Sequence, residues 1–141
     1  MIEVVCGLIL NNQHEVLMTL RDPGGLRPNM WEMPGGKKDP GESDAQCLSR
    51  ELREELGVVV RVQPTLLALD TFEWDGPDGG LDFVFVQCRL YHAIIESGNP
   101  RPLQSKALAH FDMCAALRRV PMCPSAYKFY PYVQRYIASL R

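Results

Sequence analysis

Residues 36–58 read GKKDPGESDAQCLSRELREELGV, and this stretch decides the fold of the chain. Ser43 and Gln46 have the spacing of a capping box, in which each side chain satisfies a free backbone donor at the start of a helix. Apolar residues then recur every three or four positions, which places them on one buried stripe: Ala45, Leu48, Leu52 and Leu56. Gly57 stands where a left-handed residue is expected to end the helix. We therefore predict a helix that Ser43 caps and that ends at Leu56.

Three carboxylates share one face of this helix. Glu51, Glu54 and Glu55 stand at positions i, i+3 and i+4, and like charges so placed destabilise an isolated helix. A divalent cation reverses this balance, because ligation by carboxylates alone suits Mg²⁺ or Mn²⁺ and does not suit zinc. Glycine backbone at 35–36 can approach the carboxylates and offer a carbonyl or an amide.

A solvated outer face of an amphipathic helix is the alternative interpretation. If only Glu54 and Glu55 are considered, the solvated face is the better interpretation. The full spacing favours a functional site instead, because Gly36 is followed after five residues by Glu42 and after seven more by Arg50, which begins the run RELREELGV.

The flanking segments predict a mixed α/β fold in a single domain over residues 1–141. In these segments, apolar runs typical of strands alternate with residues that break secondary structure. We expect a hairpin of two strands around the Asn-rich turn 11–14, a loop at 21–29, a strand from 58, two strands around a turn at 75–80, irregular structure at 93–105, and a short strand at 107–111. Two helices should follow, at 112–119 with Asp112 as its cap and at 127–140 with Pro131 as its start or a kink.

Composition excludes several classes of protein. Hydrophobic residues make up 46% and charged residues 23% of the 141 residues, which excludes a mainly disordered chain. A net charge of −2 gives no field that would draw the chain onto DNA or acidic lipid. An anionic ligand must therefore be bound by a local site.

The cysteines and the N-terminus indicate a cytoplasmic protein. The five cysteines are far apart and form no C-x-x-C pair, so we expect buried thiols in a reducing compartment and no zinc site. Residues 1–5 include an acid and lack the basic start of a signal peptide. The apolar run ends at Leu10, far short of a membrane span.

The pattern from Gly36 to Val58 resembles the signature box of the Nudix hydrolases at every defining position. The resemblance implies an α/β/α sandwich with a mixed central sheet. It also implies hydrolysis of nucleoside diphosphates linked to another group, with Mg²⁺ or Mn²⁺ as the cofactor.

The resemblance implies a role for each matching residue. Glu51 or Glu54 would activate the attacking water, Arg50 would orient the glutamates, and Glu42 would brace Arg50 or assist the metal. The metal ligands would be Gly35, through its carbonyl, and Glu51, Glu54 and Glu55.

The segment WEMPGGK at 31–37 resembles the MutT-like branch, which cleaves nucleoside triphosphates to a monophosphate and pyrophosphate. By this resemblance Arg21 would contact phosphate, although an exposed strand-end charge is an equal alternative. Trp31 would stack on a base or simply lie in the core. Lys37 would attract phosphate or be an ordinary loop lysine.

Two departures bear on the substrate. Members that remove oxidised guanine nucleotides have an acid shortly before the last strand, where this chain reads QSKAL at 104–108. They also read the purine edge with an amide near the C-terminal helix, where this chain has Ala126. A pyrimidine or a less selective substrate is therefore as consistent with the sequence as an oxidised purine.

We predict a nucleoside triphosphate pyrophosphohydrolase that serves to clean the nucleotide pool. The alternatives are a hydrolase of nucleotide sugars or dinucleotides and, in a different class, a non-catalytic module that senses a nucleotide. The expected partner is a small-molecule nucleotide, with no nucleic acid and no membrane. The base, the number of metal ions and the oligomeric state, a homodimer included, stay open.

Overall fold

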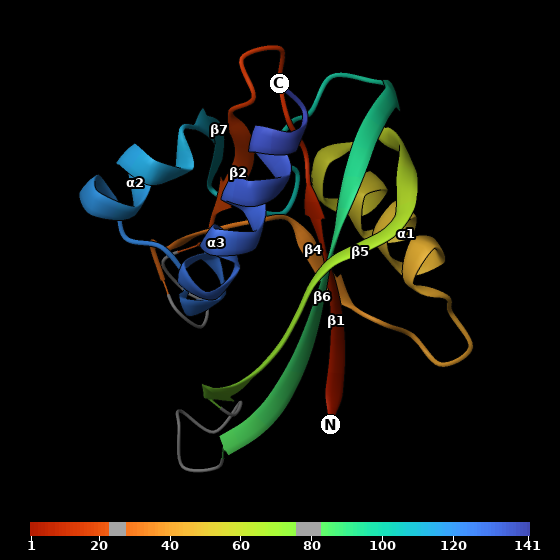
Figure 1. The fold of residues 1–141 in the computed structure, drawn as a ribbon. Helices are drawn as coiled ribbons and strands as arrows, with labels where there is room; N and C mark the ends of the chain where they lie inside the picture. The colour runs from red at the N-terminus through yellow and green to blue at the C-terminus, as the bar shows by residue number, and fades with distance from the viewer. Residues whose placement is uncertain (23–27, 76–82) are drawn as a thin grey trace.

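The computed structural model describes residues 1–22, 28–75 and 83–141. These residues form two sheets and three helices (Figure 1). One sheet has the order β4 (Gly35–Lys37), β1 (Ile2–Leu8), β6 (Phe83–Ser97) and β5 (Val59–Asp75). The other has the order β3 (Trp31–Glu32), β2 (Val16–Leu20) and β7 (Ala107–Phe111). The helices are α1 (Asp44–Leu56), α2 (Met113–Arg119) and α3 (Pro124–Ser139).

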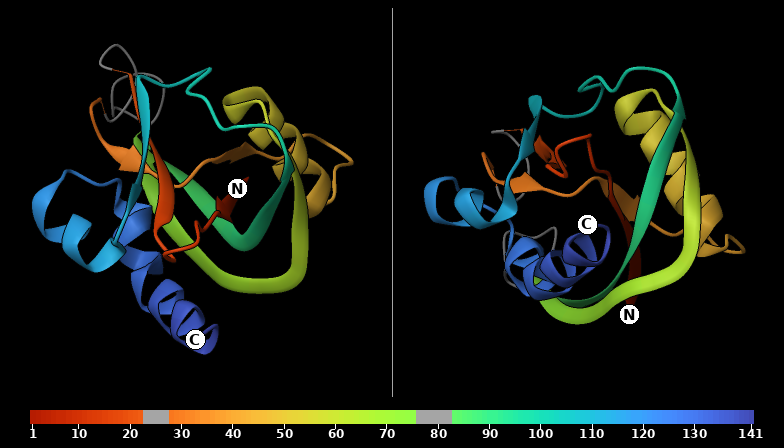
Figure 2. Two further views of the ribbon diagram at one scale, coloured as in Figure 1. Left: turned by 90° about the horizontal axis from the view of Figure 1, so that it is seen from above. Right: turned by 45° about the horizontal axis from the view of Figure 1, so that its top comes forward.

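The predicted three-layer architecture with a mixed sheet is confirmed. β1 pairs parallel with β6, whereas β4 pairs antiparallel with β1 and β5 pairs antiparallel with β6. Helix α1 lies on one side of this sheet, and α2 and α3 lie on the other side (Figures 1 and 2). None of the helices in the described residues is long and apolar enough to cross a membrane.

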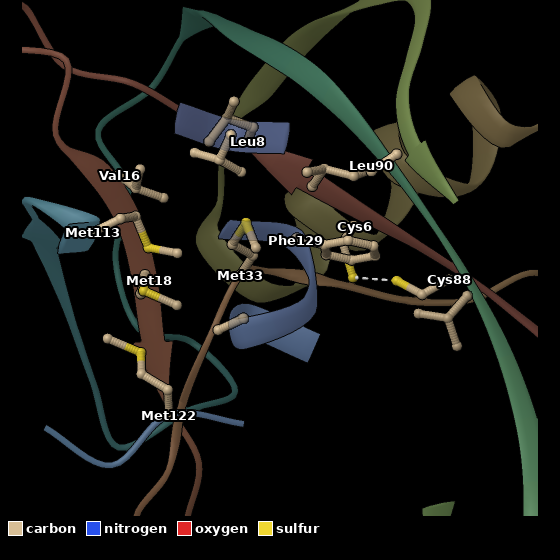
Figure 3. Close-up of a cluster of buried hydrophobic side chains, with 14 of the residues drawn as sticks. Cys6, Leu8, Val16, Met18, Met33, Cys88, Leu90, Met113, Met122 and Phe129 are labelled. Carbon is tan, nitrogen blue, oxygen red and sulfur yellow. Dashed lines mark hydrogen bonds between the residues drawn. The ribbon is translucent and has the colours of Figure 1, made fainter. Parts of the chain in front are cut away.

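Each face of β1 belongs to a separate hydrophobic core. Val4, Cys6 and Leu8 point into the larger core, together with residues of β2, β6, α2 and α3 (Figure 3). Val5 and Ile9 point into the smaller core, which is formed with the apolar stripe of α1. A strand that is buried on both faces needs apolar residues at nearly every position, which explains the continuous apolar run at the N-terminus.

The predicted N-terminal hairpin is confirmed at its turn, but the pairing does not continue along the two strands. β1 pairs with β4 and β6, and β2 pairs with β3 and β7, so the two segments belong to different sheets. Next to the turn, the chain pairs antiparallel through a bridge between Leu10 and Val16 and through hydrogen bonds from Leu17 N to Ile9 O (2.9 Å) and from Asn11 N to Glu15 O (3.1 Å). Beyond the turn the two strands diverge. The double burial of β1 is the physical reason, since it requires a central position between strands that are distant in sequence.

The strand boundaries after α1 also differ from the prediction. The two strands expected from 58 and at 66–74 form one long strand, β5, with register shifts between Val62 and Leu66 and between Leu66 and Ala68. Such bulges bend a strand and let it continue in one sheet. Residues 93–97 were expected to be irregular but extend β6, because Ala93 is buried in the core beneath α1. The turn predicted at 75–80 lies, after Asp75, outside the described residues.

The helices follow the local signals in the sequence. In α1 both bonds of the capping box are present, and Gly57 ends the helix with a φ of 71°. Asp112 caps α2 as predicted, by accepting a hydrogen bond from Ala115 N. Helix α3 begins at Pro124, earlier than expected, so that Pro131 lies inside the helix and does not start it.

Candidate active site

Arg50 is the centre of a group of acidic side chains on α1 and the segment before it. Its Nε donates to Glu42 at 2.7 Å, and its Nη1 lies 3.1 Å from Glu51 Oε1 and 3.3 Å from Glu54 Oε2. Its Nη2 donates to the carbonyl of Lys37 at 3.0 Å, which ties the helix to β4. The bond from Arg50 lowers the pKa of Glu42 to about 2, so the pair stays ionised over the physiological range.

Glu55 is hydrogen-bonded to the backbone of β4. The amide of Gly35 donates to Glu55 Oε2 at 3.2 Å. Burial, together with the negative charges of Glu51 and Glu32, raises the pKa of Glu55 to about 8. Burial likewise raises the pKa of Glu51. The site therefore holds half-buried carboxylates whose charges the surrounding protein does not fully compensate.

The two glycines of β4 are required by close approach. A Cβ on Gly36 would overlap the carboxylate of Glu51, and a Cβ on Gly35 would overlap the carbonyl oxygen of Val5 in β1. The first contact is with the movable end of a side chain, whereas the second is with backbone. A side chain at position 35 would push β1 away from β4, whereas one at position 36 would displace the carboxylate of Glu51.

The donor set fits a hard divalent cation. It consists of oxygen atoms, and the raised pKa of Glu55 marks a half-buried carboxylate that a cation would stabilise in its charged form. Within the described ranges, no group of three or more Asp, Glu, His or Cys side chains is arranged so that it could coordinate one metal ion. The carboxylate of Glu54 is bonded to Arg50 and is therefore not gathered with the other carboxylates around a common point.

A cavity of about 350 Å³ opens beside Glu55. Of the residues that the sequence singled out, Arg21, Gly35, Lys37 and Glu55 line it. Four other predicted site residues do not line it, namely Glu42, Arg50, Glu51 and Glu54. They are joined to one another through the guanidinium of Arg50. The other lining residues are Val4, Cys6, Thr19, Asp22, Glu32, Met33, Gly36, Gln104 and Ser105.

Trp31 lies apart from this cavity. Its ring packs edge-on against Phe111, with centroids 4.9 Å apart and an interplanar angle of 78°, and it packs against the larger core. Of the two alternatives left open for Trp31, these contacts favour the core. Ala126 is fully buried in the same core. Its neighbour Ser125 lines a small inner recess of about 50 Å³ that adjoins the cavity, and Ala126 does not.

Sequence reasoning missed Glu32 as a site residue. Glu32 lies in the cavity wall and forms an ion pair with Arg21, in which Nη1 of Arg21 is 3.0 Å from Oε2 and 3.3 Å from Oε1. It stands opposite Thr19 in the register of β2 and β3. No periodicity marks Glu32 in the sequence, because β3 is only two residues long.

The segment that carries Gln104 and Ser105 is attached to the end of α1. Arg101 N donates to Leu56 O at 3.0 Å, and Leu103 N donates to Glu55 O at 3.0 Å. These bonds satisfy carbonyl groups that the last turn of a helix leaves without intrahelical partners. The segment then reaches β2, where Lys106 N donates to Leu20 O at 2.9 Å. One wall of the cavity is thus built on the helix that bears the carboxylates.

Comparison with known proteins agrees with this geometry. Residues 2–132 match the NUDIX domain. Nucleoside triphosphatase NudI of Klebsiella pneumoniae is 31% identical over 94 residues, which cover 64% of this chain and 66% of that protein. NudI of Escherichia coli is 25% identical over 128 residues, which cover 82% of this chain and 91% of that protein.

The fold agrees with a solved structure as well. A MutT NUDIX hydrolase from Burkholderia pseudomallei superposes with a TM-score of 0.72 at 23% identity, over 94% of this chain and 95% of that chain. The chain therefore belongs to the Nudix hydrolase family. This confirms the predicted family, the fold class and the likeness to MutT. Members of the family generally need a divalent metal ion.

Proposed function

We propose that this chain hydrolyses a nucleoside or deoxynucleoside triphosphate to the monophosphate and pyrophosphate, with Mg²⁺ or Mn²⁺ as cofactor. The observation that carries the proposal is the cavity that the half-buried Glu55 lines together with the basic residues Arg21 and Lys37. The carboxylate of Glu55 can bind a metal cation, and the basic side chains can bind the phosphates of a nucleotide. The relatives named nucleoside triphosphatase support the same substrate class.

Each group has a task in this reaction. Arg50 holds Glu51 and Glu54 in place, and one of these two carboxylates accepts the proton of the attacking water. Lys37 and Arg21 balance the negative charge of the leaving pyrophosphate. A divalent cation bound by Glu51, Glu54, Glu55 and the Gly35 carbonyl would neutralise phosphate charge.

The test is the variant Glu54→Gln, because Glu54 is exposed and its loss leaves both cores intact. We expect an unchanged circular dichroism spectrum and a fall in kcat of at least about 100-fold, because the proposal makes Glu54 a metal ligand and one of the two candidates for the general base. The matched control is Glu96→Gln, an exposed glutamate away from the cavity, which should keep the activity. Wild-type turnover by Glu54→Gln would contradict the assignment.

Product analysis tests the substrate class. A panel of nucleoside triphosphates and nucleotide sugars is assayed with Mg²⁺ and then with Mn²⁺. Free pyrophosphate supports the proposal, whereas release of a sugar phosphate would favour cleavage of a diphosphate linkage. Tight nucleotide binding without any product would instead indicate a sensing module.

A further inference from the structure

Two buried thiols from different strands meet in the larger core. Cys6 of β1 and Cys88 of β6 have their Sγ atoms 3.2 Å apart, which Figure 3 shows as a dashed line. Cys6 is 9% exposed and Cys88 is 1% exposed. Both are free thiols, and the proposed hydrolysis uses neither of them. The pair is therefore a group of reactive atoms whose chemistry is separate from that of the carboxylates on α1.

The register of the strands makes a disulfide between these cysteines unfavourable. The residue opposite Cys6 is Leu90, and Cys88 lies two positions before Leu90 on the parallel strand. With the usual spacing and rise of strands, this offset separates the two Cα atoms by about 8 Å. A disulfide that leaves the backbone in place needs about 7 Å or less. Neither strand can slide to close the gap, because β4 pairs with the other edge of β1 and β5 with the other edge of β6.

The two thiols lie beside a space that an ion can enter. Cys6 and Cys88 both line the inner recess of about 50 Å³. This volume exceeds the roughly 10–15 Å³ that a single water molecule occupies by the same measure, so one ion fits. Cys6 also lines the main cavity of about 350 Å³. The main cavity therefore provides a route from the solvent to the thiols.

We infer that Cys6 and Cys88 form a two-coordinate binding site for a soft metal ion, of which Cu(I) is the biological example. Thiolate sulfur selects soft ions, whereas the carboxylate oxygens on α1 select hard ones. Two thiolates are enough for an ion that accepts linear coordination, but a zinc site takes three or four protein ligands. In the part of the chain that the structure describes, no third Asp, Glu, His or Cys side chain is arranged to complete such a set.

Binding requires only a small movement of the sulfur atoms. A metal–thiolate bond is about 2.3 Å long, so a linear S–metal–S unit places its sulfurs about 4.6 Å apart. The thiols are 3.2 Å apart, and rotation of the two side chains about χ1 supplies the difference without moving either strand. Each thiol releases its proton to the solvent as it becomes a ligand, and the ion keeps its oxidation state.

The experiment measures how the chain competes with a chelator for Cu(I). The reduced chain is added under nitrogen to the coloured Cu(I) complex of bicinchoninate, and the loss of absorbance reports the Cu(I) that the chain removes. We expect one Cu(I) per wild-type chain. Cys6→Ala and Cys88→Ala should each raise the dissociation constant at least about 100-fold, since loss of a residue that merely supports a ligand already costs up to that factor. The matched control Cys114→Ser changes an exposed cysteine and should keep the wild-type constant.

Two further measurements separate loss of the site from loss of the fold. Circular dichroism shows whether the alanine variants are folded. X-ray absorption at the copper edge needs no variant, and for the wild-type chain it should show two sulfur neighbours and no nitrogen or oxygen. Because neither measurement uses a nucleotide, the result is independent of the proposed function.

Several results would overturn the inference. These are no removal of Cu(I) by the wild-type chain, nitrogen or oxygen neighbours in its X-ray absorption, an unchanged constant in both alanine variants, and loss of binding in Cys114→Ser. Displacement of the bound Cu(I) by an equal concentration of Zn²⁺ would likewise overturn it, because a pair of thiolates alone does not complete a zinc site.

Discussion

Glu55 is the carboxylate whose environment differs most from water. It is bonded to the amide of Gly35, lies near Glu51 and Glu32, and lines the cavity. Its pKa is raised from 4.5 to about 8. A group whose pKa is higher in the folded chain stabilises the fold fully below its unfolded pKa and loses that contribution as the pH rises through the folded value.

This raised pKa predicts how stability depends on pH in metal-free buffer. Through Glu55 the free energy of unfolding should fall between pH 4.5 and about pH 8, by no more than about 5 kcal/mol. Glu55→Gln removes the titrating group, so its profile should be flatter than that of the wild-type chain. Urea denaturation in the presence of a chelator measures both profiles. Glu96→Gln should show the wild-type slope, and a wild-type slope in Glu55→Gln would show that the carboxyl is not desolvated.

Some site residues could be predicted from the sequence because they lie together on one helix. Glu51, Glu54 and Glu55 share a face by their spacing alone. Glu32 could not be predicted, since its place in the cavity depends on the pairing of β3 with β2 and on the bonds between Trp31 and residues 121–123. Those contacts join segments distant in sequence, and no local pattern encodes them.

At the scale of elements, β4 aligns the acidic helix with the central sheet. It pairs with β1 through Cys6 and Gly35, and its next residue, Gly36, faces Glu51. The two glycines therefore have different neighbours, namely backbone for Gly35 and a side-chain end for Gly36. A methyl group added at each position should have different effects.

Gly36→Ala should give a folded but impaired enzyme, and Gly35→Ala an unstable one. In Gly36→Ala the carboxylate of Glu51 must turn away, so kcat should fall at least about tenfold while the melting temperature changes little. In Gly35→Ala the new Cβ overlaps the β1 backbone, so the pairing of β1 with β4 must break. Thermal denaturation and kcat are measured for both variants. Equal stability of the two would contradict this account of β4.

The elements differ in how far local signals define them. Helix α1 follows from its capping box, apolar stripe and C-terminal glycine. The pairing of β1 does not follow from its sequence, because an apolar run is compatible with a hairpin and with a central strand alike. The choice is made by burial against α1 on one face and α3 on the other.

At the scale of the whole molecule, β1 joins the two cores. Phe129 is fully buried in the larger core and Leu52 in the smaller one. Because alternate residues of β1 pack into both, loss of either core exposes the same strand. The two cores should therefore unfold together in one transition.

Truncation in either core tests this coupling. Phe129→Ala should destabilise the chain by about 3–5 kcal/mol and Leu52→Ala by about 2–5 kcal/mol. Urea denaturation is followed by circular dichroism, which reports the helices, and by intrinsic fluorescence. The two signals should change together in both variants, whereas separate midpoints would show that the cores are independent units.

The bonds from residues 101 and 103 to the end of α1 restrict how the enzyme adapts to its substrates. The wall that carries Gln104 and Ser105 moves only if the last turn of the helix unwinds, and that turn also bears Glu55. The wall formed by Gln104 and Ser105 is thus fixed in position, and the cavity can change only at its other walls. A change of substrate preference among descendants of this chain would therefore arise by substitution at the inner recess, without loosening the part of the molecule that performs the hydrolysis.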